Sequence, residues 1–398
     1  MAKISTRVNG LSESVTLAID AKAKSMMANG IDVVNFAAGE PDFDTPAQVK
    51  EAAKAALDSG KTKYVASGGL PALKEAICEK LATENSLTYK PGQVLVSVGA
   101  KHSLFNVIMT IVDRGDEVII PAPYWVSYYD MVRAAEGTPV IVETNAEAGF
   151  KMTPEQLEAA ITPKTVAVFI NSPSNPTGAV YTEAELRALA DVIVRKNILC
   201  ISDEIYEKLV YGETRHFSIA AAGEDIFNRT LVVNGFSKAF SMTGWRLGYT
   251  AGPADILSAM NKLQSHSTSN ATTFAQWGAI EALKNTAAEV EAMRVAFDER
   301  RRFLVESLNA LPDVKCLLPD GAFYAFPDFS AWHGKSFNGK PIENSMGLAE
   351  YILTEGKTSI VPGVAFGAEK HQRFSYATSR ELLKKGVERI GEALSKLQ

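Results

Sequence analysis

Hydrophobic residues in the middle of the chain form short runs that alternate with longer amphipathic stretches. Six runs are rich in β-branched residues and too short for helices: "VLVSV" (94–98), "EVII" (117–120), "PVIVE" (139–143), "VAVFI" (166–170), "ILCIS" (198–202) and "TLVVN" (230–234). Most are separated by helical patterns such as "TEAELRALADVIVRK". This alternation predicts an α/β fold with a mainly parallel sheet that is buried on both faces.

The pattern changes near residue 252. Three helices are expected at 254–265, 272–284 and 287–309, and then come short strands in "GAFYAFPDFS", "TSIVPGVAF" and "QRFSYATS" before a closing helix. A chain of 398 residues is also long for a single domain. We therefore expect a second, smaller α+β domain that packs closely against the first, with a cleft between them.

Polar residues follow several of the predicted strands. Ligands of a parallel sheet bind outside the carboxyl ends of its strands, so these residues are the candidates for binding a ligand. After the predicted strands come Gly99, Ala100 and Lys101, then Asn175 in "NSPSNPTG", then Asp203, and finally Ser237 and Lys238 in "GFSK". The run from strand through glycine into a helix at "SVGAKHSLFN" is typical of an anion site, although the Walker and dinucleotide patterns are missing.

Each of these residues also has a structural explanation when it is taken alone. Asp203 suits a helix N-cap, Asn175 suits an Asn-Pro turn, and Lys238 and Arg246 suit a solvated surface. Together they place an anion-binding turn, a carboxylate, an amide, a tyrosine and two cations at one edge of one sheet. That set suits a phosphorylated aromatic cofactor with a basic nitrogen, held by a lysine imine, and pyridoxal phosphate has this chemistry.

Composition and charge narrow the classes of function. The net charge of −5 gives no general attraction to nucleic acid or to anionic membranes, and neither is expected as a partner. Cys78, Cys200 and Cys316 are few and far apart, which argues against a disulfide framework and against a metal site. No signal-peptide pattern or membrane-spanning run is present, so we expect a cytoplasmic protein.

Several blocks of the sequence, in order, resemble the class I aminotransferases of the aspartate aminotransferase fold, and specifically the bacterial subgroup Ib. They are "AAGEPDFDTP", "TKYVASGG", "PAPYWVSY", "NSPSNPTGAVY", "SDEIYEKLVY", "FSKAFSMTGWRLGY" and "RFSYATS". The resemblance implies the fold of type I pyridoxal-phosphate-dependent transferases. It also implies a large cofactor-binding domain at 46–290 and a small domain made of 1–45 and 291–398.

The resemblance implies a role for each residue that meets the cofactor ring. Lys238 would form the imine with the cofactor and, once freed, move a proton from the substrate. Asp203 would pair with the pyridine nitrogen, which strengthens the electron-withdrawing ring. Tyr206 and Asn175 would hydrogen-bond the phenolic oxygen of the ring, and Trp125 would stack on its face.

The phosphate and the second subunit are implied in the same way. Arg246 and Ser237 match phosphate-binding positions, and the backbone N–H groups of Ala100 and Lys101 would add to them. Tyr64, in "TKYVASGG", is similar to a tyrosine that reaches the phosphate of the neighbouring subunit. The resemblance therefore implies a homodimer with shared active sites.

Substrate recognition follows from the resemblance as well. Arg373, in "QRFSYATS", matches the arginine that binds the substrate α-carboxylate, whereas Arg380 is expected to be an exposed residue at a helix start. The retained Ser-x-Thr motif and Lys101 favour a dicarboxylate. The residues implied to bind substrate are Ser14, Thr16, Gly39, Lys101, Trp125, Asn175 and Arg373.

The predicted activity is transfer of the amino group of aspartate to 2-oxoglutarate in a ping-pong cycle. Two features differ from the usual pattern: Ser12-Glu13 replaces a Lys-Pro pair, which weakens an extension to prephenate, and His102 is expected to face solvent rather than to alter the pocket. Other amino donors or acceptors (alanine, an aromatic amino acid, prephenate) are the first alternative. A regulator that binds pyridoxal phosphate without turnover is the second.

Overall fold

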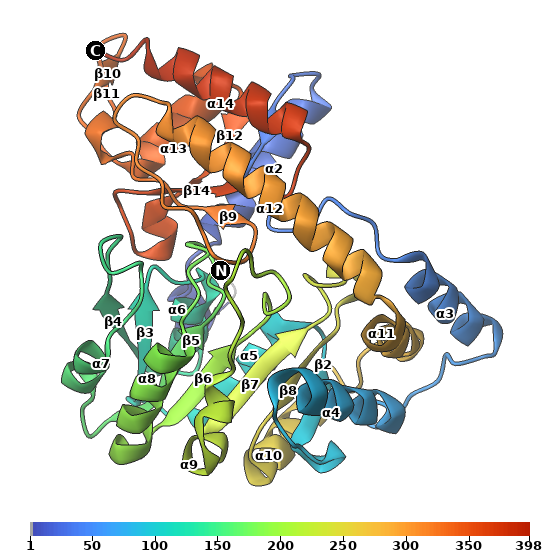
Figure 1. Ribbon diagram of the computed structural model, residues 1–398. Coiled ribbons are helices and arrows are strands. Elements are labelled where there is room, and N and C mark those ends of the chain that lie inside the picture. Colours follow the sequence, from blue (N-terminus) through green and yellow to red (C-terminus); the bar gives the residue numbers. More distant parts are fainter. Residues whose placement is uncertain (1–2) are drawn as a thin grey trace.

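The computed structural model describes residues 3–398, and a seven-stranded sheet lies at the centre of its larger part (Figure 1). The strand order is β2-β8-β7-β6-β5-β3-β4. All neighbouring strands are parallel except β8, which runs antiparallel to both β2 and β7. The strands are β2 (Val94–Ser97), β3 (Glu117–Ala122), β4 (Thr138–Glu143), β5 (Thr165–Asn171), β6 (Leu199–Asp203), β7 (Thr230–Gly235) and β8 (Gly248–Ala251).

The prediction of a mainly parallel sheet is confirmed, and the six predicted strands all form. The sequence pattern does not predict strand β8, because its four residues "GYTA" carry only a weak β-branched signal and the preceding stretch is rich in glycine and polar residues. The helices expected at 254–265 and 287–309 match α10 (Ala254–Ser265) and α12 (Ala287–Asn309), and α11 (Thr273–Asn285) begins one residue later than expected.

Both faces of the sheet are buried, which explains the continuous apolar runs. Along β3, Val118 and Ile120 pack into a cluster with α5 (Ala100–Ile111), α6 (Ser127–Ala134) and α10. Ile119 points to the opposite face and packs with α7 (Pro154–Ala160) and α8 (Glu183–Lys196). Because no face of these strands meets water, polar chemistry is confined to the ends of the strands.

The smaller part is built around a second core that contains segments from both ends of the chain. Strand β1 (Val34–Asn35) pairs in parallel with β12 (Thr358–Ser359), and β14 (Gln372–Ser375) lies between β13 (Val361–Pro362) and β9 (Tyr324–Ala325). Figure 1 shows the long helix α12 running from the smaller part toward α11 beside the sheet. The division into 46–290 and 1–45 with 291–398 stays a prediction, which the pairing of β1 with β12 supports.

The remaining elements complete the description of residues 3–398. The helices are α1 (Thr6–Asn9), α2 (Val15–Ala28), α3 (Ala47–Asp58), α4 (Pro71–Asn85), α9 (Glu224–Phe227), α13 (Ser345–Glu355) and α14 (Arg380–Leu394). A short hairpin is formed by β10 (Ser336–Phe337) and β11 (Lys340–Pro341), and the 3₁₀ turns are η1 (Pro91–Gln93), η2 (Ile219–Ala222), η3 (Thr243–Trp245), η4 (Ser330–Trp332) and η5 (Gly363–Phe366). In this range no helix combines the length and the apolar character needed to cross a membrane.

Strand β8 approaches the start of helix α5 so closely that a side chain would not fit between them. A Cβ atom built on Gly248 would lie 2.3 Å from the backbone nitrogen of Ala100 and 2.5 Å from the carbonyl carbon of Gly99. Both neighbours are backbone atoms of a helix start and cannot rotate away. The position therefore requires glycine for close approach rather than for an unusual backbone angle.

We expect Gly248→Ala to lower the free energy of unfolding by about 1–3 kcal/mol, because overpacking forces the backbone to shift. Urea unfolding followed by circular dichroism measures the effect. Gly92→Ala is the matched control, since nothing lies within 4 Å of a Cβ atom at Gly92. Equal unfolding midpoints for the two variants would contradict the packing argument.

Candidate active site

A cavity of about 420 Å³ lies at the carboxyl ends of the parallel strands and is closed from the other side by the smaller part. Thirteen of the fourteen residues predicted for the site line it: Ser14, Thr16, Gly39, Ala100, Lys101, Trp125, Asn175, Asp203, Tyr206, Ser237, Lys238, Arg246 and Arg373. Tyr64 is the exception, because it lies outside the cavity and the residue is 91% exposed.

Lys238 follows strand β7, and its amine lies at the centre of the site. Nζ donates a hydrogen bond to the carbonyl oxygen of Gly39 and lies 5.8 Å from the ring centroid of Tyr206 and 5.6 Å from that of Phe323. Burial of the amine, with a further contribution from the positive charge of Arg373, lowers the pKa of Lys238 to about 8. A substantial fraction of this amine is therefore a neutral nucleophile near physiological pH.

Asp203 is the last residue of β6, and its carboxylate is buried. The hydroxyl of Tyr128 donates to Oδ2 at 2.6 Å, and the backbone N–H of Ile205 donates to Oδ1 at 3.2 Å. Burial raises the pKa of Asp203 to about 6, although the bond from Tyr128 acts in the opposite direction. The helix N-cap explanation does not apply, because the chain continues into turns and not into a helix.

Tyr128 is a cavity residue that sequence reasoning missed. It lies on α6, three positions after Trp125 in the block "PYWVSYYD", and it stacks on Phe169 with ring centroids 4.3 Å apart. A tyrosine on an otherwise apolar helix face gives no sign of a polar partner. Only the fold brings its hydroxyl to Asp203.

Arg373 lies on β14, and its side chain lines the cavity although only 3% of the residue is exposed. Nη1 donates to Oδ1 of Asn175 at 3.1 Å and Nη2 donates to the carbonyl oxygen of Ala37 at 2.8 Å. The cation also lies 4.4 Å from the ring centroid of Tyr324. These partners are all neutral, and burial lowers the pKa of Arg373 from its ordinary value. The guanidinium can therefore bind a carboxylate in the cavity.

Tyr206 and Tyr324 form a pair beside Arg373. Their hydroxyls lie 2.9 Å apart, and burial raises the pKa of both phenols, so both are protonated at neutral pH. At least one hydroxyl hydrogen is then available to a group bound in the cavity.

The corner between α5 and β8 is an anion-binding arrangement. Gly99 precedes α5 with a positive φ of 88°, and no side chain caps the first turn of the helix. The guanidinium of Arg246 packs on this glycine, since a Cβ atom there would lie 2.5 Å from Nη2. Arg246 itself is held by a bond from Nη1 to the carbonyl oxygen of Thr243 at 2.8 Å. A helix N-terminus and an arginine thus face the same space.

At the other end of the cavity, the start of α2 contributes hydroxyl groups. Oγ of Ser14 and Oγ1 of Thr16 lie 2.9 Å apart. The ammonium of Lys101, which also lines the cavity, lies 4.9 Å from the ring centroid of Trp125. Partial burial and the charge of Arg246 lower the pKa of Lys101. A cation and two hydroxyls are therefore available to an acidic side chain of a substrate.

Two residues that the sequence left open are placed by the structure. His102 is half-buried and does not line the cavity; its Nδ1 accepts a hydrogen bond from the backbone N–H of Val98 at 3.2 Å, so the expectation that it faces solvent is wrong. Arg380 is the exposed first residue of α14, as predicted, and its guanidinium lies 4.7 Å from the ring centroid of Phe303.

Comparison with known proteins gives the family. Residues 31–390 match the family model "Aminotransferase class I and II". An aspartate aminotransferase of Bacillus sp. (strain YM-2) is 51% identical over 97% of this chain and 98% of that protein. A probable aspartate/prephenate aminotransferase of Aquifex aeolicus (strain VF5) is 48% identical over 99% of each chain.

The fold agrees with these matches over its full length. The crystal structure of the aspartate aminotransferase from Rhizobium meliloti superimposes with a TM-score of 0.96, at 42% identity and with complete coverage of both chains. An aspartate aminotransferase from Thermus thermophilus with maleate superimposes with a TM-score of 0.93 at 46% identity, over 99% of this chain and 100% of that one. From the family model, the full-length relatives and the fold, the chain belongs to the class I and II aminotransferases, which are enzymes that depend on pyridoxal phosphate.

Proposed function

We propose that this chain is an aspartate aminotransferase that transfers the amino group of aspartate to 2-oxoglutarate. The observation that carries the proposal is that the amine of Lys238 and the buried guanidinium of Arg373 line one cavity. Amino-group transfer from an amino acid has two requirements. One is an amine that reacts with the cofactor, and the other is a cation that binds the α-carboxylate of the amino acid. Several full-length relatives that are named aspartate aminotransferase support aspartate as the donor.

The charged and polar residues that line the cavity fit pyridoxal phosphate. Arg246, Ser237 and the first turn of α5 would hold the phosphate, and Asp203 would pair with the ring nitrogen. The absence of a capping side chain at Gly99 leaves this helix start accessible to an anion. Asn175 and Tyr206 would meet the ring oxygen, and the Trp125 ring would lie against the cofactor. When bound, the cofactor supplies an electron sink for the carbon chemistry of the amino acid.

Lys238, Asp203 and Tyr128 would each have a different role in the reaction. Lys238 would hold the cofactor covalently and, when released, take the proton from the substrate α-carbon, because its lowered pKa suits a general base near neutral pH. Asp203 would hold a proton on the ring nitrogen by its negative charge. Tyr128 would keep the Asp203 carboxylate in place through the bond at 2.6 Å.

A second set of cavity residues would orient the substrate. Arg373 would bind the α-carboxylate through its planar guanidinium, and Asn175 is already within 3.1 Å of that cation. Gly39 lies beside Lys238 and would complete this end of the substrate site. The side-chain carboxylate of a dicarboxylic amino acid would reach Lys101 and the hydroxyl groups at the start of α2, which are those of Ser14 and Thr16.

The assembly and the cellular location form part of the same proposal. We propose a homodimer with shared active sites, in which Tyr64 of one subunit reaches the cofactor phosphate of the other. The supporting observation is that Tyr64 is 91% exposed in a single chain, since a large exposed aromatic residue is typical of an interface. The cytoplasm is the proposed location.

A second candidate is a broader aminotransferase that also accepts prephenate. Relatives from Cereibacter sphaeroides and Thermus thermophilus, 48% and 46% identical, are named aspartate/prephenate aminotransferase. Ser12 and Glu13 offer no cation before the Ser-x-Thr motif, and the backbone N–H of Ser12 is directed to Asp130 at 3.4 Å. The local chemistry therefore favours aspartate alone.

The proposed function is tested by the half-reaction with single amino acids. The purified protein loaded with pyridoxal phosphate is mixed separately with aspartate, glutamate, alanine, phenylalanine and the amino product of prephenate, and the visible band of the bound cofactor is followed. We expect rapid loss of the band with the two dicarboxylates only. Equally rapid loss with the amino product of prephenate would establish the broader enzyme, and an unchanged band with every donor would refute the proposal.

The lowered pKa of Lys238 predicts how attachment of the cofactor depends on pH. Only the neutral amine reacts, so the rate should rise about tenfold per pH unit below pH 8 and level off above it. Stopped-flow mixing of cofactor-free protein with pyridoxal phosphate measures this rate as growth of the visible band. Lys238→Ala is the control and should give no band. A rate that still rises above a pH of about 10 would show an ordinary lysine.

Arg373 and Lys101 should affect different substrates. Arg373→Ala should reduce kcat/KM for every amino acid by about thirtyfold or more, since losing one partner of a buried charge contact costs about 2 kcal/mol or more. Lys101→Ala should reduce kcat/KM for aspartate far more than for alanine. Steady-state kinetics with both donors decide, and an equal loss on the two donors in Lys101→Ala would remove Lys101 from the specificity site.

A further inference from the structure

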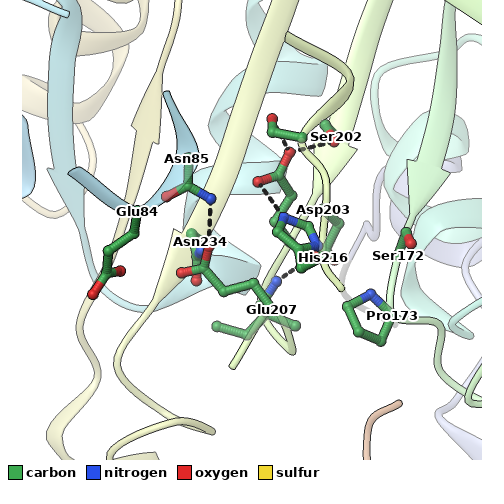
Figure 2. Close-up of polar contacts among 12 residues, drawn as sticks. Glu84, Asn85, Ser172, Pro173, Ser202, Asp203, Glu207, His216 and Asn234 are labelled. Atoms are coloured by element: carbon green, nitrogen blue, oxygen red, sulfur yellow. Dashed lines mark hydrogen bonds and ion pairs between the residues drawn. The ribbon is translucent and has the colours of Figure 1, made fainter. Parts of the chain in front are cut away.

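The segment after β6 directs its side chains to two different sides. Asp203 and Tyr206 line the cavity, whereas Glu204 and Glu207 are buried and do not line it. Figure 2 shows Asp203, Glu207 and His216 among the side chains of this region. Two groups of the active site therefore share one short segment with two carboxylates that the proposed mechanism does not use.

Glu204 is 1% exposed, and both of its carboxylate oxygens have partners. Oε1 accepts hydrogen bonds from Oγ of Ser202 at 2.9 Å and from Oγ of Ser218 at 2.6 Å. Oε2 lies 3.1 Å from Nε2 of His216, whose side chain is 9% exposed. A buried carboxylate with this many donors fixes its own position, because leaving any of the partners unpaired would be costly.

Glu207 is fixed by a different kind of contact. It accepts hydrogen bonds from the ammonium of Lys80 and, at 2.8 Å, from the side-chain amide of Asn85, both on α4. Burial alone would raise the pKa of Glu207, but the charge of Lys80 outweighs burial and, with His216, lowers the pKa to about 2.

Glu204, Glu207 and His216 form a cluster in which the atoms that could bind a metal ion all lie within 4.8 Å of one another. Glu207 needs no metal ion to balance its charge, because the ammonium of Lys80 already pairs with it, whereas Glu204 accepts hydrogen bonds from two serine hydroxyls. Glu207 therefore has its own cation. Glu204 has only neutral hydroxyls and His216, and its negative charge lies on the residue adjacent to Asp203.

We propose that Glu204 is a positioning residue for Asp203, which fixes the end of β6 through Ser202, Ser218 and His216 and strengthens the negative potential that Asp203 presents to the cofactor. The inference rests on the proposed function, in which Asp203 meets a positively charged ring nitrogen. Two neighbouring carboxylates attract such a cation more strongly than one, and each makes it easier for groups bound nearby to hold protons.

Other titratable groups surround Asp203 and Glu204, and a test of the proposal has to leave these residues unsubstituted. Near Asp203 they are Tyr128, Tyr206 and Lys238, and near Glu204 they are Tyr89, Cys200, Glu207, His216 and Tyr249. None of these is altered in the variants below.

The test uses the protein loaded with pyridoxal phosphate and follows the pH dependence of the cofactor absorbance. Glu204→Gln keeps the shape and an oxygen that accepts the serine bonds, but removes the negative charge. We expect the cofactor to remain bound and the midpoint of its pH-dependent spectral change to move to lower pH by about one unit. Ser218→Ala keeps the charge but removes one donor, so its midpoint should move in the opposite direction, to higher pH.

Glu84→Gln is the matched control. Glu84 is a glutamate on α4 that lies beside this cluster, and it pairs with Lys208 at 2.6 Å and with Lys80 at 3.6 Å, but its side chain is 39% exposed. Water screens this charge, so its loss should leave the midpoint unchanged.

The outcomes separate this inference from the proposed function. A bound cofactor whose midpoint is unmoved in both Glu204→Gln and Ser218→Ala would overturn the inference, even if both variants unfold at a lower temperature, because that pattern indicates a purely structural carboxylate. Midpoints that move in the same direction would overturn it too. Absence of a cofactor band in the unaltered protein would overturn the proposed function and this inference with it.

Discussion

Burial of both faces of the central sheet is the constraint on which the rest of the structure depends. Residues such as Val118 and Ile119 point to opposite sides and each meets a layer of helices, so a polar group placed along the strands loses its contact with water. Functional side chains are therefore collected where strands end. Asp203, the last residue of β6, and Lys238, three positions after β7, reach the cavity for this reason.

The fold was largely predictable from the sequence because the apolar runs are short, continuous and separated by stretches of helical pattern. Strand β8 was not, since four residues beginning with glycine carry little pattern and their pairing with β2 and β7 is decided by tertiary contacts. The residues of the site were predictable where they follow strands or lie in blocks that resemble a family. Tyr128 and Glu204 were not, because their importance comes from partners that are distant in sequence or hidden behind the site.

The site also shows how burial and charge produce two opposite effects in one cavity. The amine of Lys238 loses affinity for its proton because burial and neighbouring arginines disfavour the cation. The carboxylate of Asp203 gains affinity for a proton because burial disfavours the anion. Burial thus favours the neutral form of both groups, and under the proposed function the cofactor would offer an electrophilic carbon to the amine and a basic nitrogen to the carboxyl group.

Strand β8 has a geometric consequence for the choice of cofactor. Because it is inserted between β2 and β7, the anion-binding start of α5 and the amine of Lys238 follow strands that are two places apart in the sheet. Neighbouring strands are about 4.8 Å apart, so the sheet itself sets a separation of about 10 Å between the ends of these two strands. Under the proposed function, a cofactor that contacts both the start of α5 and Lys238 would therefore have to extend past the first residue of β8, Gly248.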